Sequence, residues 1–357
     1  YRKIREGNSI LKWEEAKQTN LGIDFGFLDQ TFYGSFDYFM KETSDILIEP
    51  PYLAVKGEGG NQWVNGATLE NKGWEFVLGY NKTLNNGLGI DLTANISSYK
   101  RKVTYLPDEV LTGYPGDPAN GKSVLGQSDI VHFGYIADGI FQNQAEVDNY
   151  PQQTGKDIGR IKYKDIGGLD ENGKYINKPD GVVNDLDRTW IGDPNPDFIY
   201  GLNAVFSYKN FDLNLFFQGI QGVDVYNEHK HLTDFTSIWQ GTNFGTRTLD
   251  AWTPTNTGST VPMLTLTDTN NENRYSSYFI ENGSYLKLRN LQIGYNVPDK
   301  LIKSLKLSSA RIYVQGQNVL TFKDSKGNNQ FTGVDPESPG FAYPNPTSYS
   351  IGVNLTF

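Results

Sequence analysis

The sequence contains no cysteine among its 357 residues. A chain without thiols cannot form disulfides, cannot build a zinc site from paired cysteines and cannot use a cysteine nucleophile. The absence fits a cytosolic protein and an outer-membrane protein equally well, so it does not name a compartment.

Positive charge and long apolar runs are also scarce. The chain has 32 basic against 41 acidic residues, a net charge of −9, and its basic residues form no cluster. Such a surface repels a polyphosphate, which excludes nucleic acid as a partner. No apolar run approaches the roughly 18 residues of a spanning helix. A membrane β-barrel remains compatible with the mean hydropathy of −0.51, because its strands alternate.

Catalytic motifs are equally few. The three histidines are His132, His229 and His231, and neither G-x-S-x-G nor G-x-x-x-x-G-K-[ST] occurs. The sequence indicates no nucleophile–base pair and no close carboxylate dyad. It therefore does not predict an enzyme, and no cofactor is expected with certainty.

The sequence does contain a repeated two-residue alternation. In the final stretch SYSIGVNLTF, apolar residues from Tyr349 to Phe357 alternate with small or polar ones, which is typical of a strand with one apolar face. Eight further stretches alternate similarly, so nine strands are predicted. These are NLGIDFGFL, FYGSFDYFM, GWEFVLGY, LGIDLTANIS, GLNAVFSY, FDLNLFFQG, YLKLRNLQIGYNV and ARIYVQGQNV. In YLKLRNLQIGYNV the apolar phase shifts, which predicts a bulge near Asn290.

The connections between these strands alternate in length. Short links at 29–30, 82–87, 209–210 and 298–307 alternate with long ones at 43–70, 100–197, 223–283 and 320–347. An up-and-down sheet would place all long loops at one end, as in outer-membrane barrels with long extracellular loops and short periplasmic turns. The sequence therefore predicts an all-β, transmembrane antiparallel barrel portion whose last strand runs toward the periplasm. A soluble β-sandwich is the alternative, but it has no reason to sort its loops by length.

Several stretches from about residue 11 to the end resemble the SusC/RagA family of TonB-dependent outer-membrane transporters from Bacteroidetes. They are LKWEEAKQTNLGIDFGFLDQTFYGSFDYFMKETSDIL, GATLENKGWEFVLGYN, GYIADGIFQNQAEVDNYP, IGDPNPDFIYGLNAVFSYKNFDLNLFFQG, NGSYLKLRNLQIGYNVP and ARIYVQGQNVLTF. The resemblance implies that residues 1–357 are the C-terminal part, about nine strands, of a barrel of about 22 strands. The family's N-terminal plug, TonB box and signal peptide are not found in this sequence, so we expect a piece of a longer chain.

The resemblance also implies function and partners. We expect TonB-dependent import of oligomeric nutrients, either glycan or peptide, across the outer membrane. The implied partners are a SusD-like surface lipoprotein that closes as a lid, TonB acting through the missing N-terminal part, and the surrounding lipid. Phe357 resembles the C-terminal aromatic of the barrel-assembly signal. The alternative function is a soluble or surface-attached β-rich carbohydrate-binding module, stabilised by calcium.

Two loop regions carry candidate site residues. Segment 223–283 contains aromatic and amide side chains suited to substrate or lid contacts, namely Tyr226, Trp239, Asn243, Phe244 and Trp252. The stretch YKDIGGLDENGKYINKPDGVVNDLDR resembles the family's acidic loop of the form KDxNGDGxIDxxDR, which reads like an EF-hand calcium loop. Its candidate calcium ligands are Asp165, Asp180, the Val182 carbonyl, Asp185 and Asp187. An insertion separates Asp165 from Asp180, and a solvated acidic loop without metal is the alternative.

Overall fold

The computed structural model describes residues 7–49, 63–235, 243–302, 306–323, 330–340 and 343–357 of the chain. Within these residues, nine long strands form one sheet. They are β1 (Glu15–Phe27), β2 (Phe32–Ile48), β3 (Val64–Thr83), β4 (Leu88–Tyr105), β11 (Phe198–Tyr208), β12 (Phe211–Gln221), β15 (Tyr285–Asn296), β16 (Ser309–Lys323) and β17 (Ser348–Thr356). They lie side by side in that order, and every neighbouring pair is antiparallel. The predicted all-β up-and-down fold class is confirmed.

The predicted strand bulge is confirmed in β15. Its register shifts between Leu288 and Asn290 against β16, and the same point faces a shift between Phe216 and Phe217 of β12. Against β12, Arg289 is therefore an extra residue in β15, whereas against β16 it lies opposite two residues, Asn318 and Val319. Because of this one extra residue, Leu288 before the bulge and Leu291 after it lie on the same apolar face, although they are three positions apart.

The sheet has one apolar face and one polar face. Paired residues point to the same side of a sheet, so the register aligns apolar side chains in rows across the strands. One such row contains Ile23, Phe36, Phe76 and Ile96. Many residues of this face are exposed, including Ile23 at 65% and Ile351 at 79%. The opposite face carries Asp37, Glu75, Asp91, Asn214, Gln292 and Gln315. A single layer therefore separates an apolar side from a polar side.

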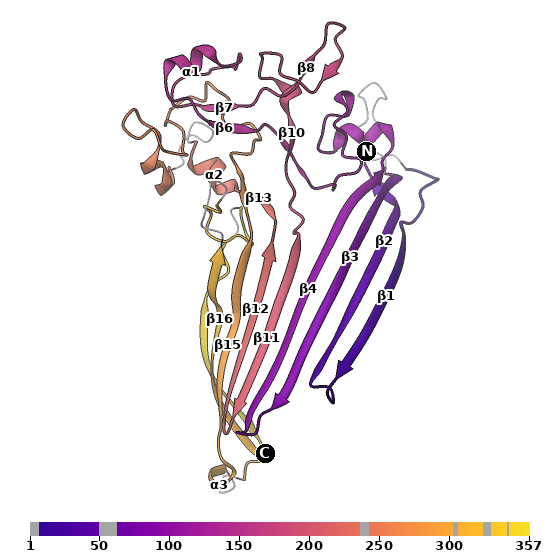
Figure 1. Ribbon diagram of the computed structural model, residues 1–357, viewed down its shortest axis with the longest axis vertical. Coiled ribbons are helices and arrows are strands. Elements are labelled where there is room, and N and C mark those ends of the chain that lie inside the picture. The colour runs from indigo at the N-terminus through magenta and orange to yellow at the C-terminus, as the bar shows by residue number, and fades with distance from the viewer. Residues whose placement is uncertain (1–6, 50–62, 236–242, 303–305, 324–329, 341–342) are drawn as a thin grey trace, which may run out of the picture.

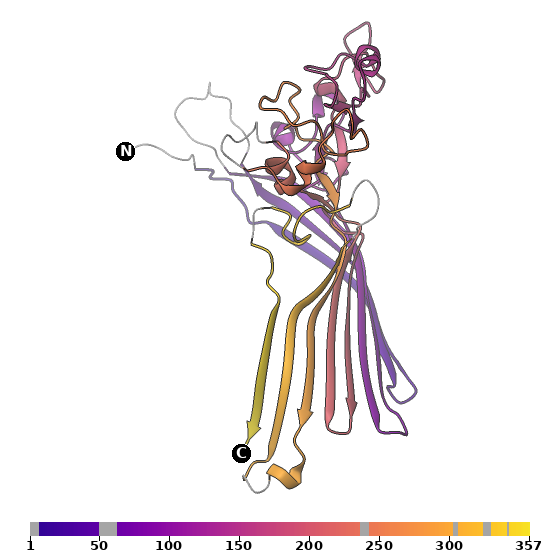
Figure 2. The ribbon, with the colours of Figure 1, turned by 90° about the vertical axis from the view of Figure 1, so that its left-hand side faces the viewer.

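Long and short connections lie at opposite ends of the sheet (Figure 1). The short turns and the C-terminal end of β17 are at the bottom of the view, and a side view shows the strands running lengthwise from there to the loops (Figure 2). Several strands extend further toward the loops than the alternation predicted. β3, for example, begins at Val64 rather than at Gly73. Its first half, with the sequence VNGATLENK, has no apolar face, so a two-residue period could not reveal it.

Short elements build a layer above the long-loop end of the sheet (Figure 1). The short strands are β5 (His132–Gly134), β6 (Ala137–Ile140), β7 (Ile161–Tyr163), β8 (Gly168–Leu169), β9 (Tyr175–Ile176), β10 (Thr189–Gly192), β13 (Asp224–Tyr226) and β14 (Ile280–Asn282). The helices are α1 (Gln144–Asn149), α2 (Glu228–Thr233), η2 (Asp108–Gly113), η3 (Pro118–Asn120), η4 (Asp185–Asp187) and η5 (Thr246–Asp250), while α3 (Asp299–Ile302) lies at the short-turn end. In the part of the chain that the structure describes, no helix is long and apolar enough to cross a membrane.

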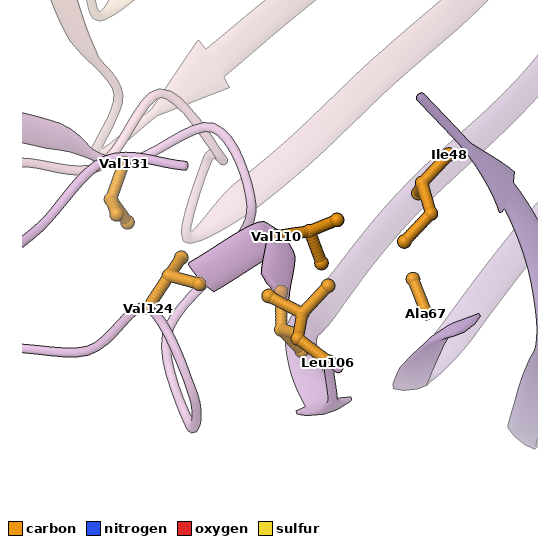
Figure 3. Close-up of a cluster of buried hydrophobic side chains, with 7 residues drawn as sticks. Ile48, Ala67, Leu106, Val110, Val124 and Val131 are labelled. Carbon is orange, nitrogen blue, oxygen red and sulfur yellow. The ribbon is translucent and has the colours of Figure 1, made fainter. Parts of the chain in front are cut away.

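The buried apolar clusters belong to the loop end rather than to the middle of the sheet. One cluster joins the ends of β2, β3 and β4 to the segment that follows β4, and it comprises Ile48, Ala67, Val103, Leu106, Val110, Val124 and Val131 (Figure 3). A second cluster lies inside the loop layer and comprises Ile161, Tyr163, Val183, Phe235 and Phe279. Burial of these side chains favours a folded loop layer by roughly 1.5–3 kcal/mol for each large residue.

Candidate functional site

The two longest loops, 106–197 and 222–284, fold together into the layer above the sheet. Arg160 and Glu272 join them through a buried ion pair of 2.7 Å, and the Ile161 N–H donates to the same carboxylate at 3.0 Å. Tyr135 adds backbone hydrogen bonds with Tyr275 and Ser277. These cross-links make the two loops one structural unit.

A cavity of about 610 Å³ lies within this layer, which is within the usual size range of ligand pockets. Its walls come from β6 and β7 of the first long loop, from α2, η5 and β14 of the second, and from the segment before β17. The lining is mostly hydroxyl, amide and aliphatic, with three charged side chains, Lys230, Arg247 and Glu281.

Glu281 is the most completely paired of these charges. Its side chain is 3% exposed, and its carboxylate accepts hydrogen bonds from Asn227, at 2.7 Å, and from the backbone N–H and hydroxyl of Thr332. The Lys230 ammonium lies 3.3 Å from it and also donates to the Tyr278 carbonyl. Burial lowers the pKa of Lys230 to about 8, although the nearby Glu281 opposes that shift.

Arg247 and Asp234 form the second buried pair at the cavity. Arg247 Nη1 lies 3.2 Å from Asp234 Oδ2, and the Tyr278 hydroxyl donates to the same oxygen at 2.6 Å. Burial raises the pKa of Asp234, and Arg247 opposes this shift. The formal charges of the two ion pairs cancel, and of their four members all but Asp234 line the cavity.

The last long loop is also fastened to the polar side of the sheet. Lys287 of β15 is 2% exposed, and its ammonium lies 2.7 Å from Asp335 and 2.6 Å from Glu337. Arg289 and the Tyr285 hydroxyl donate to the same Glu337 carboxylate. We call this group, Tyr285, Lys287, Arg289, Asp335 and Glu337, the loop clamp. It holds the wall segment that carries Thr332 in place.

The predicted contact residues fall into different environments. Tyr226 is half-buried in β13 and stacks on Tyr275, with ring centroids 4.9 Å apart and planes 3° apart. Asn243 and Phe244 are exposed, the latter at 41%. Trp239 lies outside the described residues. These placements leave Asn243 and Phe244 accessible to a partner.

The prediction that Trp252 contacts a partner needs correction, because the residue is 2% exposed. Its indole N–H donates to Gln142 at 2.8 Å. Its ring packs on Gly159, which has φ +79°, and a Cβ there would lie 2.8 Å from the ring. Trp252 is therefore a core residue of the loop layer and offers no surface to lid or substrate.

The carboxylates of the acidic loop bind the loop's own backbone. Asp165 accepts from the N–H groups of Asp180 and Gly181, and Asp180 accepts from that of Val182. Asp187 is buried and accepts from the N–H groups of residues 166, 167 and 184. Burial raises its pKa, although these hydrogen bonds act against that shift.

The remaining candidate, Asp185, turns elsewhere and accepts from the Tyr135 hydroxyl at 2.6 Å. Across the described ranges, no group of three or more His, Asp or Glu side chains is arranged to hold a metal ion. The loop geometry needs no metal to satisfy these carboxylates, and calcium binding stays a prediction.

Sequence reasoning missed the charged residues of the cavity. Lys230 lies between two histidines in the stretch HKH, within helix α2. Its main partners, Tyr278 and Glu281, are far away in the sequence, so no local pattern could indicate them. Phe357, the predicted assembly signal, is 87% exposed directly after β17.

Comparison with known proteins identifies the class. A family model described as TonB dependent receptor-like, beta-barrel, matches residues 1–227. TonB-dependent receptor P3 of Formosa agariphila is 33% identical over 98% of this chain and 35% of that protein. TonB-dependent receptor SusC of Bacteroides thetaiotaomicron is 25% identical over 98% of this chain and 32% of its own length. The RagAB peptide transporter structure superposes with a TM-score of 0.77 at 23% identity, over 99% of this chain and 36% of that chain.

The chain belongs to the TonB-dependent receptor β-barrel family. The predicted SusC/RagA relationship is confirmed, as is the outer-membrane location. The apolar face of the sheet is therefore the lipid side, the polar face is the lumen side, and the long-loop end is extracellular. The chain spans about a third of the length of the curated relatives it matches.

Proposed function

We propose that this chain forms part of a receptor that imports oligomeric nutrients, glycan or peptide, across the outer membrane. The observation that carries the proposal is the arrangement of one wall with an apolar outer face, a polar inner face and a folded loop layer with a cavity at the extracellular end. A substrate captured in that layer would lie directly above the polar lumen. No catalytic activity is part of the proposal.

The names of similar proteins support the proposal. The related proteins are TonB-dependent receptors, which supports energy supply through TonB, and RagAB is a peptide transporter. A SusD-like lipoprotein is the proposed partner, and it would contact the exposed side of the second long loop near Phe244.

A soluble carbohydrate-binding module does not fit the apolar face of the sheet. In a β-sandwich the apolar face of one sheet is covered by a second sheet. Here the described residues form one large sheet, and outward side chains such as Ile293 and Val314 are about half exposed. Lipid is the surrounding that makes such a face stable.

The proposal is tested in the native bacterium by deleting the receptor gene and measuring uptake of oligosaccharide and oligopeptide mixtures. We expect uptake of one class to fall. A receptor with segment 223–283 shortened should assemble in the membrane, release its lipoprotein partner during purification and lose that uptake. A receptor altered only at the turn 209–210, at the opposite end, is the matched control. Undiminished uptake in the deletion strain contradicts the proposal.

A further inference from the structure

Most polar groups on the cavity wall already have partners within the protein. The Ser277 hydroxyl accepts from the Ala137 N–H at 2.9 Å, and Ser259 exchanges hydrogen bonds with the backbone of Val261. Lys230 is committed to Glu281 and to the Tyr278 carbonyl. A ligand is therefore recognised by the few groups that keep free hydrogen-bonding capacity.

Arg247 is the charged group that keeps such capacity. Its ion pair with Asp234, at 3.2 Å, and its hydrogen bond to Thr332, at 3.3 Å, both use Nη1. Among the residues that the structure describes, Nε and Nη2 have no partner. The side chain is 24% exposed, and it lines the cavity. The Nε–Nη2 edge of a guanidinium matches the two oxygens of a carboxylate.

We propose that Arg247 binds a carboxylate group of the transported oligomer in this cavity. The inference rests on the proposed import function and names the chemical class of its substrate. The free groups of Arg247 are donors, so they select an acceptor. Asp234 already pairs with the guanidinium through Nη1, and the two ion pairs at the cavity carry no net charge together. A single carboxylate adds only one negative charge at the free edge of Arg247, whereas a multiply charged phosphate would add more negative charge than the remaining donors can offset.

A carboxylate can come from an acidic sugar or from an acidic peptide, and two probes distinguish these sources. Oligogalacturonate represents the first and oligoglutamate the second. Methyl-esterified oligogalacturonate and oligoglutamine are their counterparts without side-chain carboxylates, and both peptides carry an amidated C-terminus so that no terminal carboxylate is present. Binding to the full receptor, purified in detergent, is measured by calorimetry. We expect one acidic probe to bind about tenfold or more tightly than its counterpart, and the probe that does so names the source.

Variants assign this preference to Arg247. Arg247→Gln should remove the preference for the acidic probe, and Arg247→Lys should restore it only in part, because lysine lacks the paired donors. Arg247→Gln leaves Asp234 unpaired, so the double variant Asp234→Asn with Arg247→Gln serves as a neutral replacement of the pair. Arg188→Gln, which removes a partly exposed arginine elsewhere in the layer, should change nothing.

Three results would overturn the inference. They are equal binding of acidic and uncharged probes, an unchanged preference in the two Arg247→Gln receptors, and tighter binding of a sulfated glycan that has no carboxylate than of either acidic probe. Import itself is judged separately by uptake in the deletion strain. If uptake depends on the receptor but not on Arg247, import stands and carboxylate recognition fails.

Discussion

Arg160 and Glu272 are 112 residues apart in the sequence, yet their side chains form an ion pair of 2.7 Å inside the loop layer. The two side chains are 5% and 2% exposed. Further hydrogen bonds from Arg160 to Thr265, Thr267 and Thr269 surround the pair. Arg160 of the first long loop and four residues of the second thus form a single buried network, and we expect this network to couple the opening of the two loops.

We expect Arg160→Met to loosen both long loops. Removing one partner of a buried pair leaves the other charge unpaired, which costs about 3–5 kcal/mol. The local opening free energies of 106–197 and 222–284, measured by hydrogen exchange, should fall together. Lys164→Met is the control, because its pair with Asp138 is nearly half exposed and should contribute less than about 1 kcal/mol. Loosening of only one loop would contradict the cooperative layer.

The loop clamp should resist acid. Burial raises the pKa of Glu337, but hydrogen bonds from Lys287, Tyr285 and Arg289 outweigh this and lower it to about 2, against 4.5 for a free glutamate. A carboxylate with a lowered folded-state pKa stabilises fully above the unfolded pKa, and loses this contribution as pH falls toward the folded value. Segment 330–340 should therefore stay attached at pH 5 and loosen between about pH 4.5 and 2.

Hydrogen-exchange measurements on the wild type and on Glu337→Gln test this pH dependence. The difference in protection of 330–340 between the wild type and this variant should be large at neutral pH and vanish near pH 2. Glu171→Gln, at an exposed position, serves as the control. A difference that stays constant from pH 7 to pH 2 would show that Glu337 does not act through its charge.

Proteolysis of the acidic loop, residues 165–188, can tell whether the loop is held by calcium or by its own hydrogen bonds. Because Asp187 accepts three backbone N–H groups, we expect Asp187→Ala to increase proteolysis of 165–188 with or without calcium. Asp170→Ala is the comparison. It removes a carboxylate of the same region that accepts only from the nearby N–H groups of Asn172 and Lys174. If the loop binds calcium, removing calcium with a chelator should by itself increase proteolysis of the wild-type loop. Unchanged cleavage after chelation would leave only the metal-free loop.

The two faces of β16 should respond oppositely to charge. Val314 lies on the lipid side and is 52% exposed, whereas the neighbouring Gln315 lies on the lumen side. An arginine in the middle of the lipid face costs about 2–4 kcal/mol, so Val314→Arg should lower the free energy of unfolding in liposomes by that amount. Gln315→Arg should change it little. Equal effects would contradict the assignment of the faces.

The sheet could be predicted from sequence because each strand encodes its faces locally. The alternation from Leu21 to Phe27 identifies the apolar side of β1 without knowledge of its neighbour, and the bulge near Asn290 appears as a phase shift in one stretch. The loop layer carries no comparable period. Trp252 is buried because a glycine 93 positions earlier adopts a positive φ, and Arg160 depends on a glutamate in another loop. Such pairings follow from tertiary structure alone.

The extra residue in β15 has a consequence for insertions and deletions. Removing one residue from a regular strand turns every following side chain to the opposite face. Removing Arg289 would not, because Leu288 and Asn290 already lie on the faces that adjacent positions would occupy. A chain without this residue would keep its register with β12, leave Asn318 and Val319 of β16 without a facing residue, and lose one donor to Glu337. Position 289 is thus a place where evolution can adjust the hold on an extracellular loop by gaining or losing a single amino acid.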